Sequence, residues 1–346
     1  MRIGVLIPVR DPGPQLEELV RELLARELPV VLVDDGSTRG QELFAQLTGR
    51  QGVTVLTHPR GLGRGAALKT GLAHLLEEGF DGVVTAEGDG RHSPEDIARM
   101  AEALAETPDT LILGAGGSAG RKALGSATRV LLRLLYGMAL TDPLTDLRGI
   151  PLGVPEAEKL PQLKGERADY EALVLREAAS LFPGGVREMP VERRASRASG
   201  GDPFRSAGDA WRILLVLLHK LPTFILSSAT AFGLDYLLFN LLYYVVLPQF
   251  SGATFLATVG ARICSAGYNY LINKHVVFKG SGSAYNAKRF FTLAAGVLMA
   301  NLLIMHLLVD LLGLPAFLVK IPVDAVLFLV NFTVQHAWAR KGDKKT

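Results

Sequence analysis

Acidic residues stand directly after two short apolar runs of this chain. Asp34 and Asp35 follow the run that begins at Val30, and Glu87 and Asp89 follow the run Gly82–Ala86. A carboxylate at such a place can accept hydrogen bonds from ribose hydroxyls or a ring N–H. Two carboxylates one residue apart can hold a divalent cation beside a diphosphate. The pattern indicates a nucleotide site with a cation. For Asp34 and Asp35, an acidic turn around Gly36 is the alternative.

Basic residues flank a glycine-rich segment, Gly61–Gly65, at the start of a helical pattern. Backbone N–H groups and the helix dipole favour a phosphate at a helix N-terminus. We expect Arg64 to contact phosphate. For Arg60 and Lys69, a phosphate contact and a solvated helix start stay equally open.

The elements that position these residues alternate between strands and helices. We predict strands at Ile3–Val9, Val30–Asp34, Gly82–Ala86 and Thr110–Gly114, and helices at Pro14–Leu28, Gly61–Leu76 and Pro94–Leu104, the last capped by Ser93. Such alternation predicts an α/β fold, a Rossmann-like, mostly parallel sheet with helices on both faces. Ligands bind beyond the carboxyl ends of strands in these sheets, which is where the acidic residues fall.

The last third of the chain is nearly free of charge over long stretches. Four segments can each cross about 30 Å of hydrocarbon, and we predict transmembrane helices at Thr223–Leu247, Ala253–Asn273, Phe290–Leu312 and Pro315–Trp338. Lys and Arg concentrate in the loop after the second segment and in the tail, which predicts that both lie on the cytosolic side. Asp235, Arg262, Lys320 and Asp324 fall within the spans, either as ion pairs that hold the bundle or as a polar path for a lipid phosphate.

Bulk properties narrow the function classes. The 346 residues suggest two domains, and a net charge of +3 is too small to indicate nucleic acid as a partner. Cys264 is the single cysteine, so no internal disulfide forms. A cleavable leader pattern is absent from the N-terminus, so we expect the first domain to stay in the cytosol.

Several motifs in order resemble the family 2 glycosyltransferases, within the dolichol-phosphate mannose synthase and bactoprenol glucosyltransferase (GtrB-like) branch. The resemblance covers about residues 1–218 and rests on Ile7-Pro8-Val9-Arg10-Asp11, Val33-Asp34-Asp35-Gly36-Ser37-Thr38, Gly61-Leu62-Gly63-Arg64-Gly65, Glu87-Gly88-Asp89-Gly90-Arg91-His92, Asp142-Pro143-Leu144-Thr145-Asp146-Leu147-Arg148 and Asp202-Pro203-Phe204-Arg205. The membrane part is similar to the GtrA-like family, on Asn273-Lys274-His275-Val276-Val277-Phe278.

The resemblance implies a GT-A type fold followed by an all-α domain of four transmembrane helices. Its expected parts are a cytosolic nucleotide-sugar domain (1–200), a juxtamembrane amphipathic segment (201–221), a GtrA-like transmembrane domain (222–340) and a basic cytosolic tail (341–346). It implies a multi-pass protein of the cell membrane, a hexosyltransferase of cell-envelope glycan synthesis. One sugar would pass from a UDP- or GDP-linked donor to a polyprenyl phosphate of undecaprenyl or dolichyl type. The partners are the nucleotide sugar, the polyprenyl phosphate and the bilayer, and a homo-oligomer is plausible.

The resemblance also assigns roles to residues. Catalytic roles fall to Asp89, Asp142 and Arg148. The nucleotide sugar would be bound by Pro8, Arg10, Asp34, Asp35, Arg64, Lys69, Glu87 and Arg91. The lipid phosphate would be bound by Arg121, Arg205 and Arg212. The metal, Mg²⁺ or Mn²⁺, would be held by Asp89 and Glu87.

Three residues depart from the family pattern. Glu87 replaces the usual Asp, Arg91 replaces a Gln that can coordinate metal, and Asp146 replaces a Gly. A guanidinium cannot bind a cation, but it can contact a diphosphate directly. We expect His92 to be a hydrogen-bonded neighbour of the metal site rather than a ligand.

A lipid monophosphate is already a nucleophile at neutral pH, because its second pKa is about 6. The chemistry therefore needs no dedicated general base, and a single displacement predicts inversion at the sugar. The Gln-x-x-Arg-Trp motif of processive members is absent, which predicts one sugar per lipid. The rival interpretation is a non-catalytic binder of nucleotide sugar or lipid whose membrane domain translocates a lipid-linked sugar.

Overall fold

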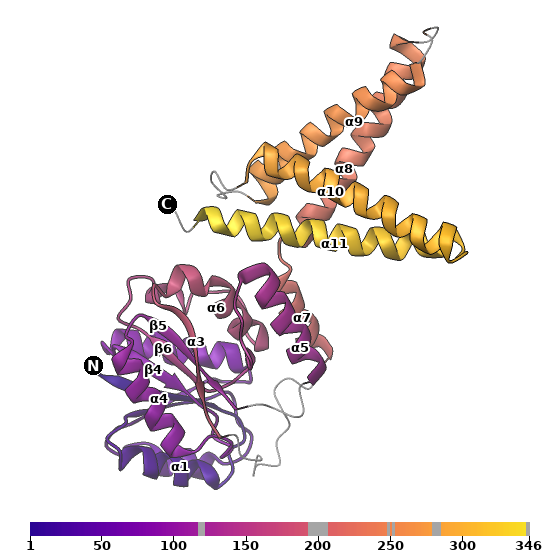
Figure 1. The fold of residues 1–346 in the computed structure, drawn as a ribbon. Coiled ribbons are helices and arrows are strands. Elements are labelled where there is room, and N and C mark those ends of the chain that lie inside the picture. Colours follow the sequence, from indigo (N-terminus) through magenta and orange to yellow (C-terminus); the bar gives the residue numbers. More distant parts are fainter. Residues whose placement is uncertain (117–121, 193–206, 248–249, 251–252, 279–284, 344–346) are drawn as a thin grey trace. The chain divides into compact units, whose positions relative to one another are not determined.

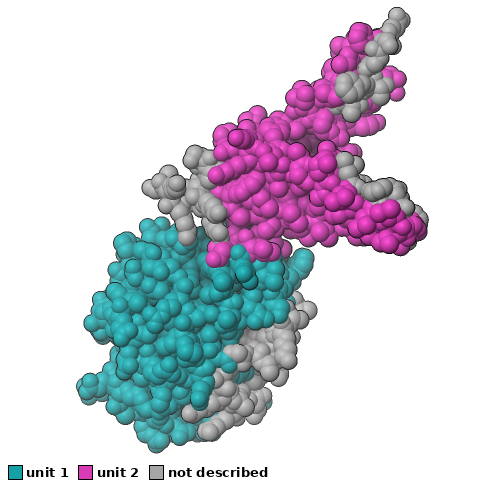
Figure 2. Space-filling model, in the orientation of Figure 1, with its two compact units in different colours: residues 1–133, 138–217 teal, residues 134–137, 218–346 magenta. Residues whose placement is uncertain are grey.

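The computed structural model describes residues 1–116, 122–192, 207–247, 250, 253–278 and 285–343. Its elements form two compact units, residues 1–133 with 138–217 and residues 134–137 with 218–346, coloured separately in Figure 2. The first unit holds the sheet with its helices, and the second is helical (Figure 1).

The first unit is built on a seven-stranded sheet in the order β3-β2-β1-β4-β6-β5-β7. The strands are β1 (Ile3–Val9), β2 (Val30–Asp34), β3 (Val53–Thr57), β4 (Gly82–Thr85), β5 (Thr110–Ala115), β6 (Arg148–Pro151) and β7 (Gly185–Pro190). All neighbours pair in parallel except β6, which runs antiparallel to β4 and β5. The predicted mostly parallel α/β sheet is confirmed.

Both faces of the sheet are buried, which explains why β1 reads as a continuous apolar run. Successive side chains of a strand point to opposite faces. Val5 and Ile7 belong to the core shared with α1 (Gln15–Leu24) and α4 (Pro94–Glu106). Leu6 points to the opposite face, toward α3 (Arg64–Glu77). A Cβ on Gly71 of that helix would lie 2.1 Å from the Leu6 side chain.

The remaining helices of this unit are α2 (Gln41–Leu47), α5 (Lys122–Leu131) with the π-type turn η2 (Leu132–Tyr136), the 3₁₀ turn η3 (Ala157–Lys159), α6 (Ala168–Leu181) and α7 (Ala207–Leu217). The predicted cap of α4 is present: the Ser93 hydroxyl accepts a hydrogen bond from the Asp96 amide at 3.1 Å. Sequence reasoning missed β3, β6, α2 and α6. Of these, β6 contributes most to the site, since it begins with Arg148 and the loop directly before it carries Asp146.

The described residues of the second unit form four long helices, each of which follows one predicted membrane segment. They are α8 (Leu221–Asn240) with η4 (Leu241–Val246), α9 (Ala253–Ile272) with η5 (Asn273–Val277), α10 (Ala287–Met305) with η7 (His306–Leu311), and α11 (Ala316–Asp343). Among the described residues, one helical span, Leu221–Val246, is long and apolar enough to cross a membrane.

Polar side chains from three of these helices meet in a buried network. The Ser227 hydroxyl of α8 donates to the side-chain oxygen of Asn273 at 2.7 Å, and the side-chain amide of Asn273 donates to the side-chain oxygen of Gln335 of α11 at 3.3 Å. The Tyr285 hydroxyl also donates to Gln335. Asn273 and Gln335 are almost wholly buried. The motif residue Asn273 therefore joins helices.

An aromatic cluster lies beside this network. The Phe224 ring packs against the rings of Phe278 and Phe332, at centroid distances of 6.0 and 5.2 Å. Phe278, the last residue of the Asn273–Phe278 motif, is fully buried. Both ends of the motif thus serve packing within the helical unit.

Two of the charges within the predicted spans form an ion pair. The Arg262 guanidinium lies 3.5 Å from the Asp235 carboxylate, which also accepts a hydrogen bond from Ser265 at 2.8 Å. Asp324 accepts a hydrogen bond from Asn301 at 2.6 Å, which joins α11 to α10. The side chain of Lys320 lies outside the described residues. These contacts agree with the interpretation that charges hold the bundle together.

We predict that Asn273→Leu lowers the thermal stability of the helical unit. The change removes the bonds that Asn273 makes to Ser227 and Gln335 and puts an apolar side chain against these buried polar groups, which costs about 1–3 kcal/mol. Thermal unfolding in detergent, followed by circular dichroism, measures the effect. Asn240→Leu is the matched control, because the bond described for the Asn240 side chain runs to the Tyr236 carbonyl of its own helix. Equal melting temperatures of the two variants would contradict the joining role.

Candidate active site

The carboxyl ends of β1 and β2 form one border of the site. Val9 pairs with Asp34 at the ends of these strands. The Asp34 carboxylate is buried and accepts a hydrogen bond from the Ser37 amide at 2.8 Å. Gly36 has a φ of 66°, and a Cβ there would lie 2.3 Å from the backbone of Arg60. The turn therefore requires glycine at this position.

Asp35 anchors the glycine-rich segment to that turn. Its two carboxylate oxygens accept hydrogen bonds from the amides of Leu62 and Gly63, each at 2.8 Å, and one of them also pairs with the His58 ring at 2.9 Å. Burial alone would raise the pKa of Asp35, but these hydrogen bonds outweigh it and hold the pKa below its usual value. Asp35 thus has a definite structural role besides any contact with a nucleotide.

The glycines of this segment allow a close approach of another loop. A Cβ on Gly63 would lie 2.5 Å from the Glu166 carbonyl oxygen, and one on Gly65 would lie 2.7 Å from the Arg167 carbonyl oxygen. The Ala66 amide donates to the Glu166 carbonyl at 3.0 Å. The start of α3 is therefore covered by the chain's own backbone, so the expected phosphate at this helix N-terminus receives no support from the geometry.

Three further residues were predicted to bind the nucleotide sugar: two lie at the end of β1 and one lies on α3. Pro8 is half-buried in β1, and Arg10 is exposed directly after it, with its guanidinium against Gly61. Lys69 is half-buried on α3. Of these three residues, Arg10 is the one that is exposed, and it lies beside the Asp34–Asp35 turn.

Arg64 lies at the centre of a buried ionic cluster. Its guanidinium is 3.3 Å from Glu87, 3.5 Å from Glu171 and 3.7 Å from Asp146. Burial would lower the pKa of Arg64, but the three carboxylates raise it above its usual value, so the residue stays charged. Arg64 therefore neutralises carboxylates of its own chain, where sequence reasoning expected a phosphate.

Glu171 was missed by sequence reasoning. It lies on α6 and is almost fully buried between apolar residues. The helical spacing of Ala168, Ala172 and Leu175, all buried, would have placed Glu171 on the inner face and marked it as a buried charge that needs a partner.

Arg148 stabilises the loop before β6 from inside the domain. Only 2% of the residue is exposed. Its guanidinium donates to the carbonyls of Thr145 at 2.9 Å, Glu171 at 3.1 Å and Pro143 at 3.3 Å. Burial lowers the pKa of Arg148, against the effect of Glu171 and Asp146. The geometry is that of a positioning residue, one that fixes the loop carrying Asp142 and Asp146.

Asp142 is positioned by the strand at the sheet edge. The Glu188 carboxylate of β7 accepts hydrogen bonds from the Thr141 amide at 2.7 Å and hydroxyl at 2.9 Å, and from the Asp142 amide at 2.9 Å. The loop between Thr141 and Arg148 is thus held at one end by Glu188 and at the other by the Arg148 guanidinium.

Three charged residues follow β4 and pair with one another. The Arg91 guanidinium lies 2.7 Å from the Asp89 carboxylate and 3.4 Å from the Glu87 carboxylate. The Asp89 carboxylate also accepts the Arg91 amide at 3.1 Å. Arg91 therefore stands between the two carboxylates that the sequence predicted as metal ligands.

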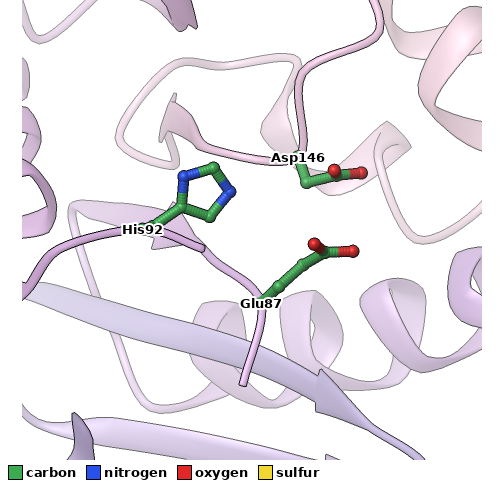
Figure 3. Close-up of side chains that lie close together, drawn as sticks. All are labelled: Glu87, His92 and Asp146. Atoms are coloured by element: carbon green, nitrogen blue, oxygen red, sulfur yellow. The ribbon is translucent and has the colours of Figure 1, made fainter. Parts of the chain in front are cut away.

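A different group of donors satisfies the geometry of a cation site. Ligand atoms of Glu87, His92 and Asp146 all lie within 4.8 Å of one another, and Figure 3 shows the three side chains together. All three residues are buried. Two carboxylates and an imidazole form a donor set that divalent transition metals accept. These donors suit a divalent cation by type, and the Arg64 guanidinium also lies against two of them, 3.3 Å from Glu87 and 3.7 Å from Asp146.

The predicted lipid-phosphate residues are only partly described. Arg212 is exposed on α7, next to Trp211, whose exposed fraction is 62%. Arg121 and Arg205 lie outside the described residues. An exposed indole beside an exposed guanidinium is typical of a surface that meets lipid headgroups.

Comparison with known proteins follows the division into two parts. Residues 4–129 match the family "Glycosyl transferase family 2", and residues 223–340 match "GtrA/DPMS, transmembrane domain". An undecaprenyl-phosphate mannosyltransferase of Micrococcus luteus is 31% identical over 219 residues, which are 58% of this chain and 89% of that protein. The chain belongs to glycosyl transferase family 2, a family of glycosyltransferases, and it carries a GtrA-type membrane domain.

Other relatives align over shorter stretches. An undecaprenyl-phosphate 4-deoxy-4-formamido-L-arabinose transferase of Edwardsiella ictaluri is 34% identical over 119 residues, 32% of this chain and 35% of that protein. The chain thus spans about a third of that relative's length. Glucosyl-3-phosphoglycerate synthase of Mycobacterium tuberculosis, solved with Mn²⁺ and UDP-glucose, superposes with a TM-score of 0.50 at 19% identity and covers 63% of this chain and 78% of that one. This likeness supports the GT-A type fold.

Glu87 makes the stability of the protein depend on pH. Burial and the neighbouring Asp146 carboxylate raise the pKa of Glu87 from 4.5 to about 8, although Arg64 and Arg91 oppose the shift. Between these values the folded protein holds a proton that the unfolded chain lacks, so its stability falls as the pH rises through this window. We predict that Glu87→Gln, measured in EDTA, melts at a temperature that depends less on pH between about 5 and 8 than that of the wild type.

The control is Glu102→Gln, an exposed carboxyl on α4. This variant should follow the wild-type pH curve. If Glu87→Gln also runs parallel to the wild type, Glu87 is ionised in the fold throughout this range.

Proposed function

We propose that this protein transfers one sugar from a nucleotide sugar, UDP- or GDP-linked, to a membrane polyprenyl phosphate of undecaprenyl or dolichyl type, with inversion and with the help of a divalent cation. The observation that carries the proposal is the charged cluster at the carboxyl ends of β2 and β4, joined in one chain to a GtrA-type domain. The Micrococcus luteus relative, named for transfer to undecaprenyl phosphate, supports the acceptor class.

The donor would lie across the strand ends. Asp34 and Asp35 offer acceptors to the base and ribose, and Arg10 offers a cation nearby. The diphosphate would then reach the cluster of Glu87, Asp89 and Arg91. A divalent cation held beside Glu87 would neutralise the charge that develops on the leaving nucleoside diphosphate. The solved Mycobacterium tuberculosis synthase with Mn²⁺ and UDP-glucose supports this general arrangement.

The chain's own residues have the task of orientation and charge balance. The acceptor phosphate is a nucleophile without a general base, so the rate depends on holding it in line with the anomeric carbon. Arg148 and Glu188 fix the loop that carries Asp142, which we place near the sugar. The Arg91 guanidinium, held by Asp89 and Glu87, adds a fixed positive charge where the diphosphate departs.

The acceptor would arrive from the membrane. We place residues 1–200 in the cytosol, the segment 201–221 at the bilayer surface, 222–340 as four transmembrane helices and 341–346 as a cytosolic tail. The Lys and Arg residues of the loop near Lys274 and Lys288, together with the tail, support this orientation. Arg212, with Arg121 and Arg205, would meet the lipid phosphate at the headgroup level.

Asp89→Asn tests the proposed function. Purified full-length protein is incubated with labelled UDP- and GDP-sugars, polyprenyl phosphate and Mg²⁺ or Mn²⁺, and lipid-linked label is counted. We predict label transfer by the wild type, and a loss on the order of 100-fold or more in Asp89→Asn, which frees Arg91 and removes charge from the cluster. Asp81→Asn is the matched control, because Asp81 precedes β4 at the opposite end of the same strand.

Two outcomes would count against the proposal. Full activity of Asp89→Asn would exclude the cluster after β4 as the reacting centre. Binding of a nucleotide sugar by the wild type without lipid-linked product, for every donor, would favour the rival function of a binder whose membrane domain translocates a lipid-linked sugar.

A single displacement also fixes the stereochemistry. We predict that an α-linked nucleotide sugar yields a β-linked lipid product, because the acceptor phosphate attacks the face opposite the leaving diphosphate. The anomeric coupling constant of the isolated lipid-linked sugar, measured by NMR, gives the configuration. Retention would contradict attack on the face opposite the leaving diphosphate.

A further inference from the structure

The two carboxylates that the sequence predicted as metal ligands already face donors of the chain itself. The two oxygens of Glu87 face two guanidinium groups, that of Arg64 at 3.3 Å and that of Arg91 at 3.4 Å. One oxygen of Asp89 lies 2.7 Å from the Arg91 guanidinium, and the other accepts the Arg91 amide at 3.1 Å. Each of the four carboxylate oxygens is thus opposite a positive or hydrogen-bonding group.

The two guanidinium groups differ in how many of their nitrogens are used. Arg64 directs Nη1 at Glu87, Nη2 at Asp146 and Nε at Glu171. Arg91 directs Nε at Asp89 and Nη1 at Glu87. Among the described residues, Nη2 of Arg91 has no hydrogen-bond or ion-pair partner, and this nitrogen is not buried. Arg91 is therefore held on one side and keeps two N–H donors for a ligand.

The three departures from the family pattern all belong to this network of paired charge. Arg91 replaces a Gln and brings the guanidinium. Glu87 has one methylene more than the usual Asp and faces both guanidinium groups. Asp146 replaces a Gly and lies 3.7 Å from Arg64. Together the departures install a fixed guanidinium after β4, where the family pattern has groups that coordinate a metal.

A divalent cation would compete with Arg91 for the same carboxylates. To bridge Asp89 and Glu87 it would have to displace the Arg91 guanidinium, and repulsion between like charges disfavours this. A guanidinium can perform the same electrostatic task, since its N–H groups form strong charge-assisted hydrogen bonds with phosphate oxygens. A positive group that is held in place before the reaction stabilises the charge that develops in it.

We propose that Arg91 shares the task of the divalent cation: Nη2 contacts the leaving diphosphate, Asp89 and Glu87 are positioning residues for the guanidinium, and part of the sugar transfer needs no cation. This inference rests on the proposed function and narrows the role of the cation in it. An acceptor phosphate oxygen forms the bond to the anomeric carbon, and the bond from that carbon to the diphosphate breaks. The diphosphate leaves with the electron pair, and its added negative charge faces Arg91.

Binding of a nucleoside diphosphate without metal tests the contact directly. Purified full-length protein in detergent and EDTA is titrated with UDP and with GDP in a calorimeter. We expect the wild type to bind one of them, and Arg91→Gln to bind it about tenfold more weakly or worse, because a charge-assisted hydrogen bond is lost. Arg21→Gln is the matched control, since Arg21 is an exposed arginine on α1. Its affinity should equal that of the wild type.

Sugar transfer in EDTA tests the cation-independent part. We expect the wild type to keep about a tenth or more of the rate that it shows in Mn²⁺, and Arg91→Gln in EDTA to fall on the order of 100-fold below the wild type in EDTA. Added Mn²⁺ should restore much of the activity of Arg91→Gln, because the change frees Asp89 and Glu87 and supplies a side chain that can coordinate a cation. Electron paramagnetic resonance of free Mn²⁺ should show tighter Mn²⁺ binding by Arg91→Gln than by the wild type.

Thermal unfolding in EDTA shows whether each variant keeps its fold. If Arg91→Gln unfolds, Arg91→Lys takes its place. This variant keeps the positive charge but loses the planar fork, so we expect its loss of diphosphate affinity to lie between those of the wild type and of a neutral residue. The binding and transfer of the wild type in EDTA need no variant at all.

The outcomes separate this inference from the proposed function. A wild type that neither binds a nucleoside diphosphate nor transfers sugar in EDTA, yet transfers sugar in Mn²⁺, would overturn the inference and leave the proposed function intact. Binding in EDTA that Arg91→Gln does not weaken would overturn it as well. Arg91-dependent binding in EDTA by a protein that transfers no sugar under any condition would uphold the diphosphate contact and reject the proposed function.

Discussion

The pairing of buried charge around Arg64 is the constraint on which the site depends. A guanidinium out of water is costly unless carboxylates surround it. Arg64 begins α3, and its three partners come from three other places: Glu87 after β4, Asp146 before β6 and Glu171 on α6. The cluster therefore fixes the positions of these elements relative to one another. Because it forms within the protein itself, the charged groups are in place before a ligand arrives, which is the condition for electrostatic catalysis.

The same cluster explains how a sheet of mixed direction serves one site. The carboxyl ends of β2 and β4 lie at one edge because the two strands flank β1 in parallel. Since β6 runs antiparallel to β4, the loop that enters β6 reaches the same edge, and Asp146 arrives beside Glu87. Arg148 then secures this loop through the carbonyls of Pro143 and Thr145. Glycine at positions 36, 63 and 65 lets the backbone of Arg60 and of the Glu166–Arg167 loop pack directly against these positions.

Much of the framework could be predicted from the sequence. The apolar runs Ile3–Val9 and Val30–Asp34 form strands with the expected bounds, because buried parallel strands need apolar residues on both faces. The four long apolar segments form helices, as their length and their lack of charge predicted. By contrast, β3 has only half-buried residues along most of its length, and β6 has four residues that include Arg148, so neither shows a clear apolar pattern.

Long-range pairing accounts for the differences at the site. Arg64 looked like a phosphate contact from its place after two glycines, but its partners come from residues 23, 82 and 107 positions further along the chain. The motif that contains Arg148 suggested a place near the sugar for this residue. In the fold, Arg148 is buried. A linear pattern reveals residue types and spacing, and only the fold decides which charges meet.

The central claim is that this chain makes a lipid-linked sugar rather than only binding its precursors. The most direct measurement is mass spectrometry of the lipids formed when the purified protein is given polyprenyl phosphate, a donor mixture and Mn²⁺. A polyprenyl phosphate that carries one sugar, formed with one nucleoside diphosphate released per lipid, is the predicted result. Unchanged polyprenyl phosphate in a sample that nevertheless binds the nucleotide sugar would contradict it.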